Sequence, residues 1–176
     1  MEFQRLVPKL SIVNVVATAE LNQHIVLERL VHERGFFYDT AIYRCAYLKD
    51  RKTRAKVSVF STGKMISVGA KSLEDARHDL NHATRRLEQL RLIRPTKIAM
   101  KLQNIVATGE IGQAIDIEKL STTLPNIIYE PEQFPGAIYY AKEPEGASIL
   151  IFANGKVVFA GLKRKELLEV GQHVLM

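Results

Sequence analysis

The sequence predicts an α+β fold in which one structural unit occurs twice. Two repeated motifs support this prediction. Residues 14–18 (Asn-Val-Val-Ala-Thr) recur at 104–108 as Asn-Ile-Val-Ala-Thr, and residues 60–64 (Phe-Ser-Thr-Gly-Lys) recur at 152–156 as Phe-Ala-Asn-Gly-Lys. Each half also repeats the same order of elements: a strand, a helix, several antiparallel strands and a helix that closes the unit. We therefore expect two pseudo-symmetric repeats.

The repeats are predicted at residues 7–94 and 95–176, intimately joined in one core. Strand edges left open in one half would pair most simply with the other half, because unpaired edges invite aggregation. The expected result is one continuous antiparallel sheet with the helices on one of its faces.

In the first repeat, alternating residues predict a strand over 11–19, with Asn14, Val16 and Thr18 on one face. Apolar residues at near-helical spacing predict a short helix over 21–34. Three strands are then expected at 38–48, 54–61 and 64–69. The sequence Ser-Leu-Glu-Asp at 72–75 is typical of a helix start, and an amphipathic helix should follow it to about residue 94.

The second repeat is predicted to follow the same order after Pro95. A strand is expected over 101–110 and a helix over 115–124. The later strands are placed at 137–142, 148–153 and 156–161, and a last helix from Lys163.

Composition limits the possible functions. The chain has 176 residues, of which 47% are hydrophobic and 25% charged, as in ordinary globular proteins with a sizeable core. No apolar run reaches the ~20 residues that a membrane-spanning helix needs, and the first residues lack a secretory hydrophobic region, so an intracellular protein is expected. The single Cys45 cannot form an internal disulfide and is given no role.

The net charge of +6 comes from the first half, because Lys and Arg balance Asp and Glu after Leu92. A basic half suits nucleic acid or another polyanion, although many basic proteins bind neither. On the long helix, Arg77, His78, Arg85 and Arg86 are interpreted as a solvated face in preference to a binding stripe. His78 and His82 lie one turn apart, and a metal site there is the less favoured interpretation.

The repeated strands are apolar on both faces, whereas an antiparallel sheet usually leaves one face in water. Helices can cover one face, so the other should expose a large apolar surface, and such surfaces mark binding sites. Asn14 and Asn104 are expected on that exposed surface. A buried amide without partners costs about 1–3 kcal/mol, so a repeated amide suits a surface that recognises hydrogen-bond acceptors.

These motifs, together with the run Tyr-Glu-Pro-Glu-Gln-Phe-Pro-Gly at 129–136, resemble the TATA-box-binding protein family, and the last run resembles its archaeal members. The resemblance covers about residues 7–176 and is looser in the first half. It implies a saddle with a ten-stranded antiparallel sheet and helices on the convex face. The concave face of such a saddle lies on the minor groove of kinked DNA.

The resemblance also implies roles for individual residues. The base and minor-groove contacts would be Asn14, Val16, Ile66, Val68, Asn104, Val106, Leu150, Val158 and Ala160. The wedges that open base steps would be Tyr38, Phe60, Phe134, Pro135 and Phe152. The phosphate ligands would be Arg44, Lys64, Lys71, Lys156 and Lys163. Glu130 and Glu132 would contact transcription factor B.

Several positions depart from the family pattern. Val68 and Ala160 replace threonines that contact bases, Ser58 replaces a leucine, and Tyr140 replaces an arginine that binds phosphate. Tyr38 is chosen as a wedge by aligning residues 41–43 with 137–139, and Phe37 would take its place if the register slips by one. These departures affect the expected sequence preference and bending more than the fold.

The resemblance therefore implies a general transcription initiation factor whose partners are promoter DNA, transcription factor B and, indirectly, RNA polymerase. The alternative is a diverged paralogue that acts mainly as a protein-interaction module. An enzyme is disfavoured because the sequence has no phosphate-binding Gly loop, HExxH motif or Cys/His cluster, and no cofactor or metal is expected. Without DNA the apolar face could pair with a second copy. The expected location is the cytoplasm with its archaeal nucleoid, or the nucleus of a eukaryote.

Overall fold

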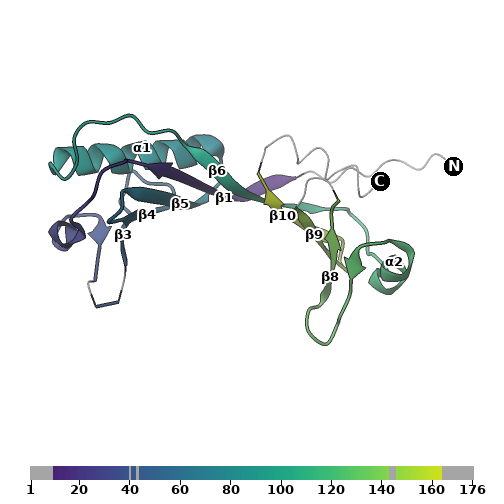
Figure 1. Ribbon diagram of the computed structural model, residues 1–176. Helices are drawn as coiled ribbons and strands as arrows, with labels where there is room; N and C mark the ends of the chain where they lie inside the picture. Colours follow the sequence, from purple (N-terminus) through teal and green to yellow (C-terminus); the bar gives the residue numbers. More distant parts are fainter. Residues whose placement is uncertain (1–9, 40, 43, 143–145, 164–176) are drawn as a thin grey trace. The chain divides into compact units, whose positions relative to one another are not determined.

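The computed structural model describes residues 10–39, 41–42, 44–142 and 146–163 (Figure 1). Ten strands form one antiparallel sheet in the order β2-β3-β4-β5-β1-β6-β10-β9-β8-β7, which confirms the predicted sheet. The strands are β1 (Ser11–Glu20), β2 (Phe36–Phe37), β3 (Cys45–Leu48), β4 (Lys56–Phe60), β5 (Lys64–Ala70), β6 (Lys101–Glu110), β7 (Ile127–Ile128), β8 (Gly136–Tyr140), β9 (Ser148–Phe152) and β10 (Lys156–Leu162). Helices α1 (Leu73–Gln89) and α2 (Ile117–Thr123) and a 3-10 turn, η1 (Leu27–Leu30), complete the described elements.

The first half packs α1 against β4 and β5, so that one face of its sheet is covered (Figure 1). Strand alternation sends Val15, Ala17 and Met65 toward the helix, and each has no exposed surface. Ser72 caps the helix, because its side chain accepts a hydrogen bond of 3.0 Å from the Asp75 N–H. Burial of the apolar stripe of α1 against the sheet therefore defines the first core.

Helix α1 ends at Gln89, before the predicted end near residue 94. Arg91 has a left-handed φ of 54°, which stops the helix. The following segment is held by Gln23, whose side chain accepts from the Arg94 N–H at 2.8 Å and donates to the Arg94 carbonyl at 3.1 Å. The Gln23 side chain therefore satisfies the backbone N–H and carbonyl of Arg94, and the helix need not continue to provide partners for them.

The predicted helix over 21–34 is wrong, because only η1 forms there. The backbone N–H groups of Leu21 and Ile25 donate to the β4–β5 hairpin, at the carbonyls of Gly63 and Ser61. The helix-like spacing of apolar residues reflects burial of a loop and not a helix. Leu21, Ile25 and other apolar residues of this loop are buried in the core. In the second half the predicted helix does form, as α2, with Asp116 as its cap.

The predicted strand over 38–48 is wrong in its extent, because only β3 forms within it, at residues 45–48, and β2 precedes it at residues 36–37. In the second half the strand predicted at 137–142 forms as β8, and β7, at residues 127–128, was not predicted. These two-residue strands lie at the two edges of the sheet. Short edge strands offer little unpaired backbone to another chain.

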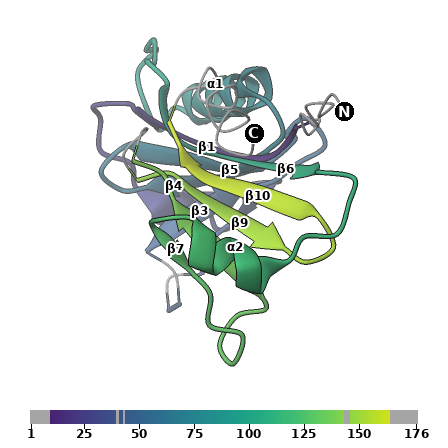
Figure 2. The same ribbon diagram turned by 90° about the vertical axis from the view of Figure 1, so that its right-hand side faces the viewer.

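The second half builds its core from buried residues of β6, β9 and β10, including Ile105, Ile151 and Phe159. Figure 2 shows β9 and β10 side by side, as their pairing requires. Helix α2 lies beside β8. The predicted last helix lies outside the described residues, except for Lys163 at its start. The described part of the chain contains no helix long and apolar enough to cross a membrane.

Candidate nucleic-acid interface

Each half of the sheet has a second face, here called the open face, whose side chains are half-buried or exposed. It comprises Asn14, Val16, Thr18, Ser58, Phe60, Ile66 and Val68 in the first half, and Asn104, Val106, Thr108, Leu150, Phe152, Val158 and Ala160 in the second. Directly paired residues of antiparallel strands share a face. Val16 pairs with Val68 and Thr18 with Ile66 in the first half, and Thr108 pairs with Val158 in the second.

The structure thus brings all nine predicted base-contact residues onto the open faces of their halves. Leu150 lies directly opposite Val158, which continues the apolar row of the second half. Val68 is 39% exposed, and Ala160 is half-buried. The two replaced threonine positions therefore present methyl groups where a hydroxyl would have offered a hydrogen bond.

The two asparagines make the same hydrogen bond in both halves. Asn14 Oδ1 accepts from the Gly69 N–H at 2.8 Å, and Asn104 Oδ1 accepts from the Gly161 N–H at 3.0 Å. Only the oxygen of a side-chain amide can accept from an N–H, so each bond fixes which end of the amide is turned inward. The NH₂ group of each asparagine is left as the outer end.

A β-bulge produces each of these bonds. The β1–β5 register shifts between Val15 and Val16, so Gly69 is an extra residue in β5, and β10 has an equivalent shift before Leu162. An extra residue leaves a backbone N–H outside the ladder, and the asparagine oxygen accepts it. Gly69 and Gly161 have φ values of 99° and 80°, which favour glycine.

Two of the predicted wedges meet in the second half. The rings of Phe134 and Phe152 make an edge-to-face contact with centroids 5.7 Å apart. Gly136 makes room for them, because a Cβ there would lie 3.0 Å from Phe134 and 3.1 Å from Phe152. Phe134 is tied to the preceding loop through its N–H, which donates to the Glu130 carbonyl at 2.9 Å, and Pro135 beside it is exposed.

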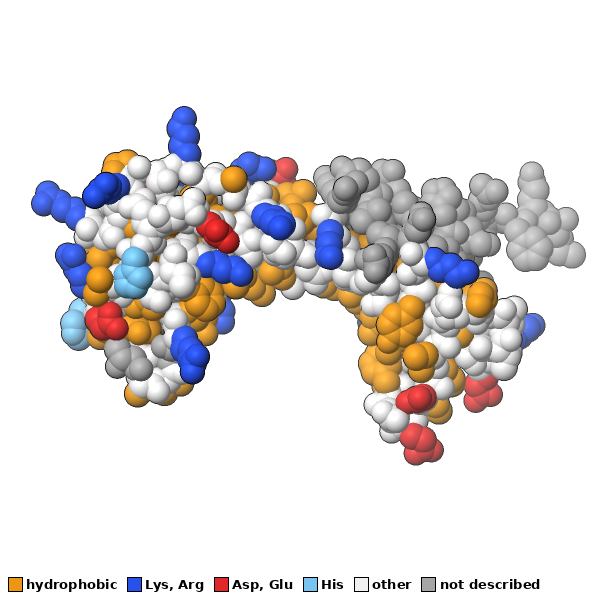
Figure 3. Space-filling view, in the orientation of Figure 1, with side chains coloured by type: hydrophobic (Ala, Val, Ile, Leu, Met, Phe, Trp, Pro, Cys, Tyr) orange, Lys and Arg blue, Asp and Glu red, His pale blue; other side chains and the backbone are white. Residues whose placement is uncertain are grey.

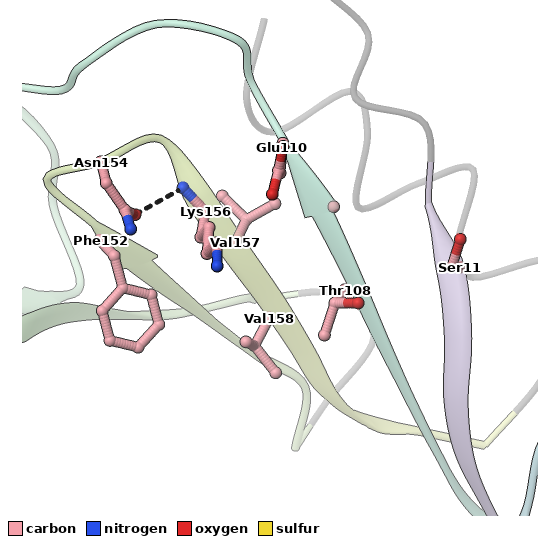
Figure 4. Close-up of a pocket in the computed structure, with 9 residues that line it drawn as sticks. Ser11, Thr108, Glu110, Phe152, Asn154, Lys156, Val157 and Val158 are labelled. Carbon is pink, nitrogen blue, oxygen red and sulfur yellow. Dashed lines mark hydrogen bonds between the residues drawn. The ribbon is translucent and has the colours of Figure 1, made fainter.

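An open hollow lies next to Phe152 on this face (Figure 4). Thr108, Val158 and the stem of Lys156 line it together with the Phe152 ring. The turn at its rim is fixed by Asn154, whose Oδ1 accepts from the Lys156 N–H at 3.0 Å. The hollow therefore combines apolar surface with a cation, Lys156, and an anion, Glu110, at its edge.

The first half presents Phe60 on its open face, but its surroundings differ. Cys45 is paired with Phe60 where Gly136 is paired with Phe152. The Cys45 thiol is buried, and it adds a side chain at a position where the second half has none.

This pairing corrects the alignment that selected Tyr38. Cys45 and Gly136 occupy equivalent positions in the two halves, because they pair with Phe60 and Phe152. Counting back along the chain from each of them makes Tyr38 equivalent to Tyr129. The alignment of residues 41–43 with 137–139 is therefore wrong. The match of Ala-Ile-Tyr in both halves is a local similarity, whereas hydrogen-bonded pairing sets the true register. The same count assigns Tyr43 to Phe134, and Tyr43 lies outside the described residues. Phe37, the alternative wedge, is 62% exposed opposite Tyr47.

The predicted phosphate ligands are exposed, and they lie at the ends of strands. They are Arg44, Lys64, Lys71, Lys156 and Lys163. Lys64 is paired with Glu20, and Lys156 is paired with Glu110, at equivalent places in the two halves. Tyr140, which replaces an expected arginine, is 49% exposed.

Glu130 and Glu132 are exposed in the loop between β7 and β8. Figure 3 shows acidic side chains at the end of the second half where this loop lies in Figure 1. The loop is closed by two hydrogen bonds to the Glu130 carbonyl, from the N–H groups of Gln133 and Phe134. The acidic side chains and the Phe134 ring are therefore held by one turn.

The polar face of α1 is largely engaged in structural contacts. Asp79 is fully buried and accepts from the backbone N–H groups of Arg54 and Ala55, which fixes the β3–β4 loop. His82 donates from Nε2 to Asp50 at 2.8 Å. No cluster of three metal-binding side chains occurs in the part of the chain that the structure describes.

The pKa of Asp50 is lowered by its surroundings. Burial opposes its ionisation, but the hydrogen bond and positive charge of His82 and the N–H groups of Lys52 and Thr53 outweigh burial, so the pKa is lowered. Asp50 also lies 3.5 Å from Arg86. The carboxylate therefore stabilises the junction between α1 and the β3–β4 loop.

Four residues that lie at the open faces or support them were not among the predicted site residues. Thr18 and Thr108 lie beside Ile66 and Val158, and Gly69 and Gly161 hold the asparagines. The sequence contained a signal for all four, because each recurs at a matched position of the repeat. Their roles depend on strand register, which the repeat alone does not give.

Comparisons with known proteins agree with this geometry. The family model described as "Transcription factor TFIID (or TATA-binding protein, TBP)" matches residues 9–90 and 99–173. The chain is similar to the TATA-box-binding protein of Cenarchaeum symbiosum, with 38% identity over 86% of this chain and 84% of the relative. It is 35% identical to that of Thermococcus celer, over 88% and 82% of the two chains.

A solved structure described as Methanococcus jannaschii TBP superimposes on the chain with a TM-score of 0.84. The match covers 96% of this chain and 97% of the other, at 29% sequence identity. The family model, the relatives and the solved structure therefore agree along nearly the whole sequence, and the chain belongs to the TATA-binding protein family.

Proposed function

We propose that this chain is a general transcription initiation factor that binds A·T-rich promoter DNA in the minor groove through its open faces and performs no catalysis. The observation that carries the proposal is the repeated asparagine, Asn14 and Asn104, whose oxygen is turned inward to a backbone N–H. A role in transcription accords with the family and with relatives named TATA-box-binding protein.

The amide orientation favours A·T pairs. In the minor groove both A·T and T·A present only acceptors, whereas G·C adds the guanine amino donor. An asparagine with its NH₂ outward donates to the acceptors and meets the guanine amino group unfavourably. Val16, Val106 and their apolar neighbours would pack against sugars and base edges without adding strand polarity. The expected preference is therefore for A·T over G·C, with little distinction between A·T and T·A.

The phenylalanines would kink the duplex. Phe134 and Phe152 form one apolar pair, with Pro135 beside it, and Phe60 occupies the matched strand position in the first half. Minor-groove proteins insert such side chains between base steps and offset the cost of unstacking with the contacts that bent DNA allows. Tyr38 is the predicted wedge in the first half and Phe37 is its alternative, but the strand register supports neither, because it assigns Phe37 to Ile128 and Tyr38 to Tyr129.

The exposed cations would bind phosphates and set the salt dependence of binding. They are Arg44, Lys64, Lys71, Lys156 and Lys163. Their contribution should be the same for all sequences, because phosphates carry no base information. Affinity and specificity are therefore assigned to different residues.

Protein partners would bind elsewhere. Glu130 and Glu132 are exposed on a closed turn, which suits docking of a basic surface, and we assign them to transcription factor B, with RNA polymerase recruited through that factor. In the absence of DNA, two copies would pair through the apolar open faces.

A second candidate function rests on Val68 and Ala160. These residues remove hydroxyl groups from the open faces, and Tyr140 removes a cation, so DNA binding could be weak in a paralogue that acts through its protein partners. The same experiment separates the two candidates. It measures the affinity of the protein for a fluorescently labelled A·T-rich duplex and for a G·C-substituted control, by anisotropy across a salt series.

An initiation factor should favour the A·T duplex by tenfold or more at each salt concentration. Equal, purely salt-driven binding to both duplexes would overturn the DNA-reading role and favour the partner-binding paralogue. A matched measurement with Asn104→Asp should remove the preference, because a carboxylate has no donor to offer.

A further inference from the structure

The bulge glycines Gly69 and Gly161 contact the asparagines through their backbone, and they themselves carry no side chain that could meet DNA. We infer that they are positioning residues: each holds one asparagine amide with its NH₂ outward and so determines discrimination against G·C pairs. This inference rests on the proposed function, because it assigns the source of base selectivity to the same site.

The hydrogen bond selects one end of the asparagine amide. A free asparagine side chain can turn about its last torsion, and its two ends are nearly the same size. With oxygen outward, the amide would accept from the guanine amino group and so tolerate G·C. With NH₂ outward it can donate to adenine N3 or thymine O2. Selectivity therefore requires one orientation, and the N–H of Gly69 at 2.8 Å holds the oxygen inward.

Each of the two N–H groups belongs to a glycine with a positive φ. Gly69 has a φ of 99° in a bulge of β5, and Gly161 has a φ of 80° in a bulge of β10. These angles aim the unpaired N–H at the asparagine. An L side chain disfavours them, so a substitution would turn the peptide and move the donor.

The residues that precede the two glycines on the open faces are apolar. Val68 and Ala160, immediately before the glycines, carry no hydrogen-bonding group. Base selectivity in this chain therefore depends more heavily on the asparagine amides than it would with threonines there. Loss of the amide orientation should therefore cause a large loss of the preference for A·T over G·C duplexes.

Gly69 is the glycine to test. A Cβ there would meet nothing closer than Ala55 Cβ at 3.9 Å, so Gly69→Ala changes the backbone preference without a clash. At Gly161 an added Cβ would clash with the Gly146 carbonyl, and a variant there would disturb packing as well. Gly112 offers a matched control, because its φ is 84°, nothing lies within 4 Å of an added Cβ, and neither asparagine is bonded to it.

The experiment measures the ratio of affinities for A·T and G·C duplexes with wild type, Gly69→Ala, Gly69→Asn and Gly112→Ala. Gly69→Ala should lower the ratio at least fivefold. Gly69→Asn should lower it less than Gly69→Ala does, because asparagine tolerates a positive φ better than alanine. Gly112→Ala carries similar backbone strain and should leave the ratio within twofold of wild type. An unchanged ratio in Gly69→Ala, or an equal loss in Gly112→Ala, would overturn the inference.

A second measurement needs no variant and no DNA. Isotope-labelled wild-type protein should show a scalar coupling across the hydrogen bond, from the Gly69 amide nitrogen to the Asn14 side-chain carbonyl carbon. Absence of this coupling would overturn the inference even if Gly69→Ala fails to fold. If the coupling is present but the wild-type protein does not prefer the A·T duplex, the proposed function is wrong. The orientation of the Asn14 amide would still be established.

Discussion

Asn104 and Gly161 are joined by a hydrogen bond of 3.0 Å between the side-chain oxygen of one and the backbone N–H of the other, and Asn14 and Gly69 repeat this bond at 2.8 Å. One bond could be a local accident of packing. Its recurrence at matched bulges of two repeats makes the outward NH₂ groups the central feature of the proposed DNA-binding surface.

Asn104→Asp should weaken binding to A·T duplexes by tenfold or more, a loss of at least about 1.4 kcal/mol. One carboxylate oxygen can still accept from Gly161, but the other would face base acceptors with a negative charge. Anisotropy titration measures the loss. Asn81→Asp is the control, because it adds the same charge on α1, on the covered side of the sheet, and it should change the affinity less than threefold. Equal effects would show that net charge alone is responsible.

Phe152→Ala should reduce the bending of the bound DNA in a protein that still folds. Removal of the ring takes away half of the edge-to-face pair with Phe134, so the remaining wedge has less apolar surface with which to open a base step. Energy transfer between dyes at the duplex ends should fall toward the value of free DNA. Val13→Ala removes apolar surface at a 40% exposed position on the opposite face of β1 from Asn14 and Val16, and should leave the transfer unchanged. Full bending by Phe152→Ala would exclude it as a wedge.

The double variant Lys64→Gln and Lys156→Gln should lower affinity for A·T and G·C duplexes by the same factor. Each phosphate contact adds about 0.9 to the slope of log K against log salt, so loss of two contacts should lower the slope by roughly 2. Lys119→Gln, on α2, should leave the slope unchanged. A change in the A·T preference instead of the slope would mean that the lysines contact bases.

Asp50→Asn should destabilise the protein at pH 7 by about 1–2 kcal/mol, because it removes a carboxylate that binds His82. The pKa of Asp50 is lowered from 3.8 in the folded state, so its contribution is present above the unfolded pKa and is lost as pH falls through the folded pKa. The difference in the free energy of unfolding should persist from pH 7 to about pH 5 and shrink below about pH 4. Denaturant unfolding at several pH values measures it, and a difference independent of pH would contradict the ionic role.

Much of the fold could be predicted from the repeat and from strand alternation. The alternation of Asn14, Val16 and Thr18 identified the open face, and the start of α1 at Ser72 followed from its capping residues. The helix over 21–34 could not be rejected from sequence, because burial of Leu21 and Ile25 in a loop imitates helical spacing. Only the hydrogen bonds to the β4–β5 hairpin distinguish the two.

The candidate site was predictable by residue type but not by register. Asn104 and Phe152 stand out in the sequence because they are repeated, whereas the bond to Gly161 depends on a one-residue bulge. Register also explains the mistaken choice of Tyr38, because a matching tripeptide carries no information on which strand residues face each other. Pairing of Cys45 with Phe60 supplies that information.

The most direct test of the central claim uses a duplex in which every G·C pair of the G·C control is replaced by hypoxanthine and cytosine. Such a pair keeps the major-groove pattern of G·C but lacks the guanine amino group, so its minor groove presents acceptors only, as in A·T. If the open faces recognise the minor groove, affinity for this duplex should equal that for the A·T duplex within about threefold, a difference below about 0.7 kcal/mol. Affinity as low as that for the G·C duplex would contradict recognition through the minor groove.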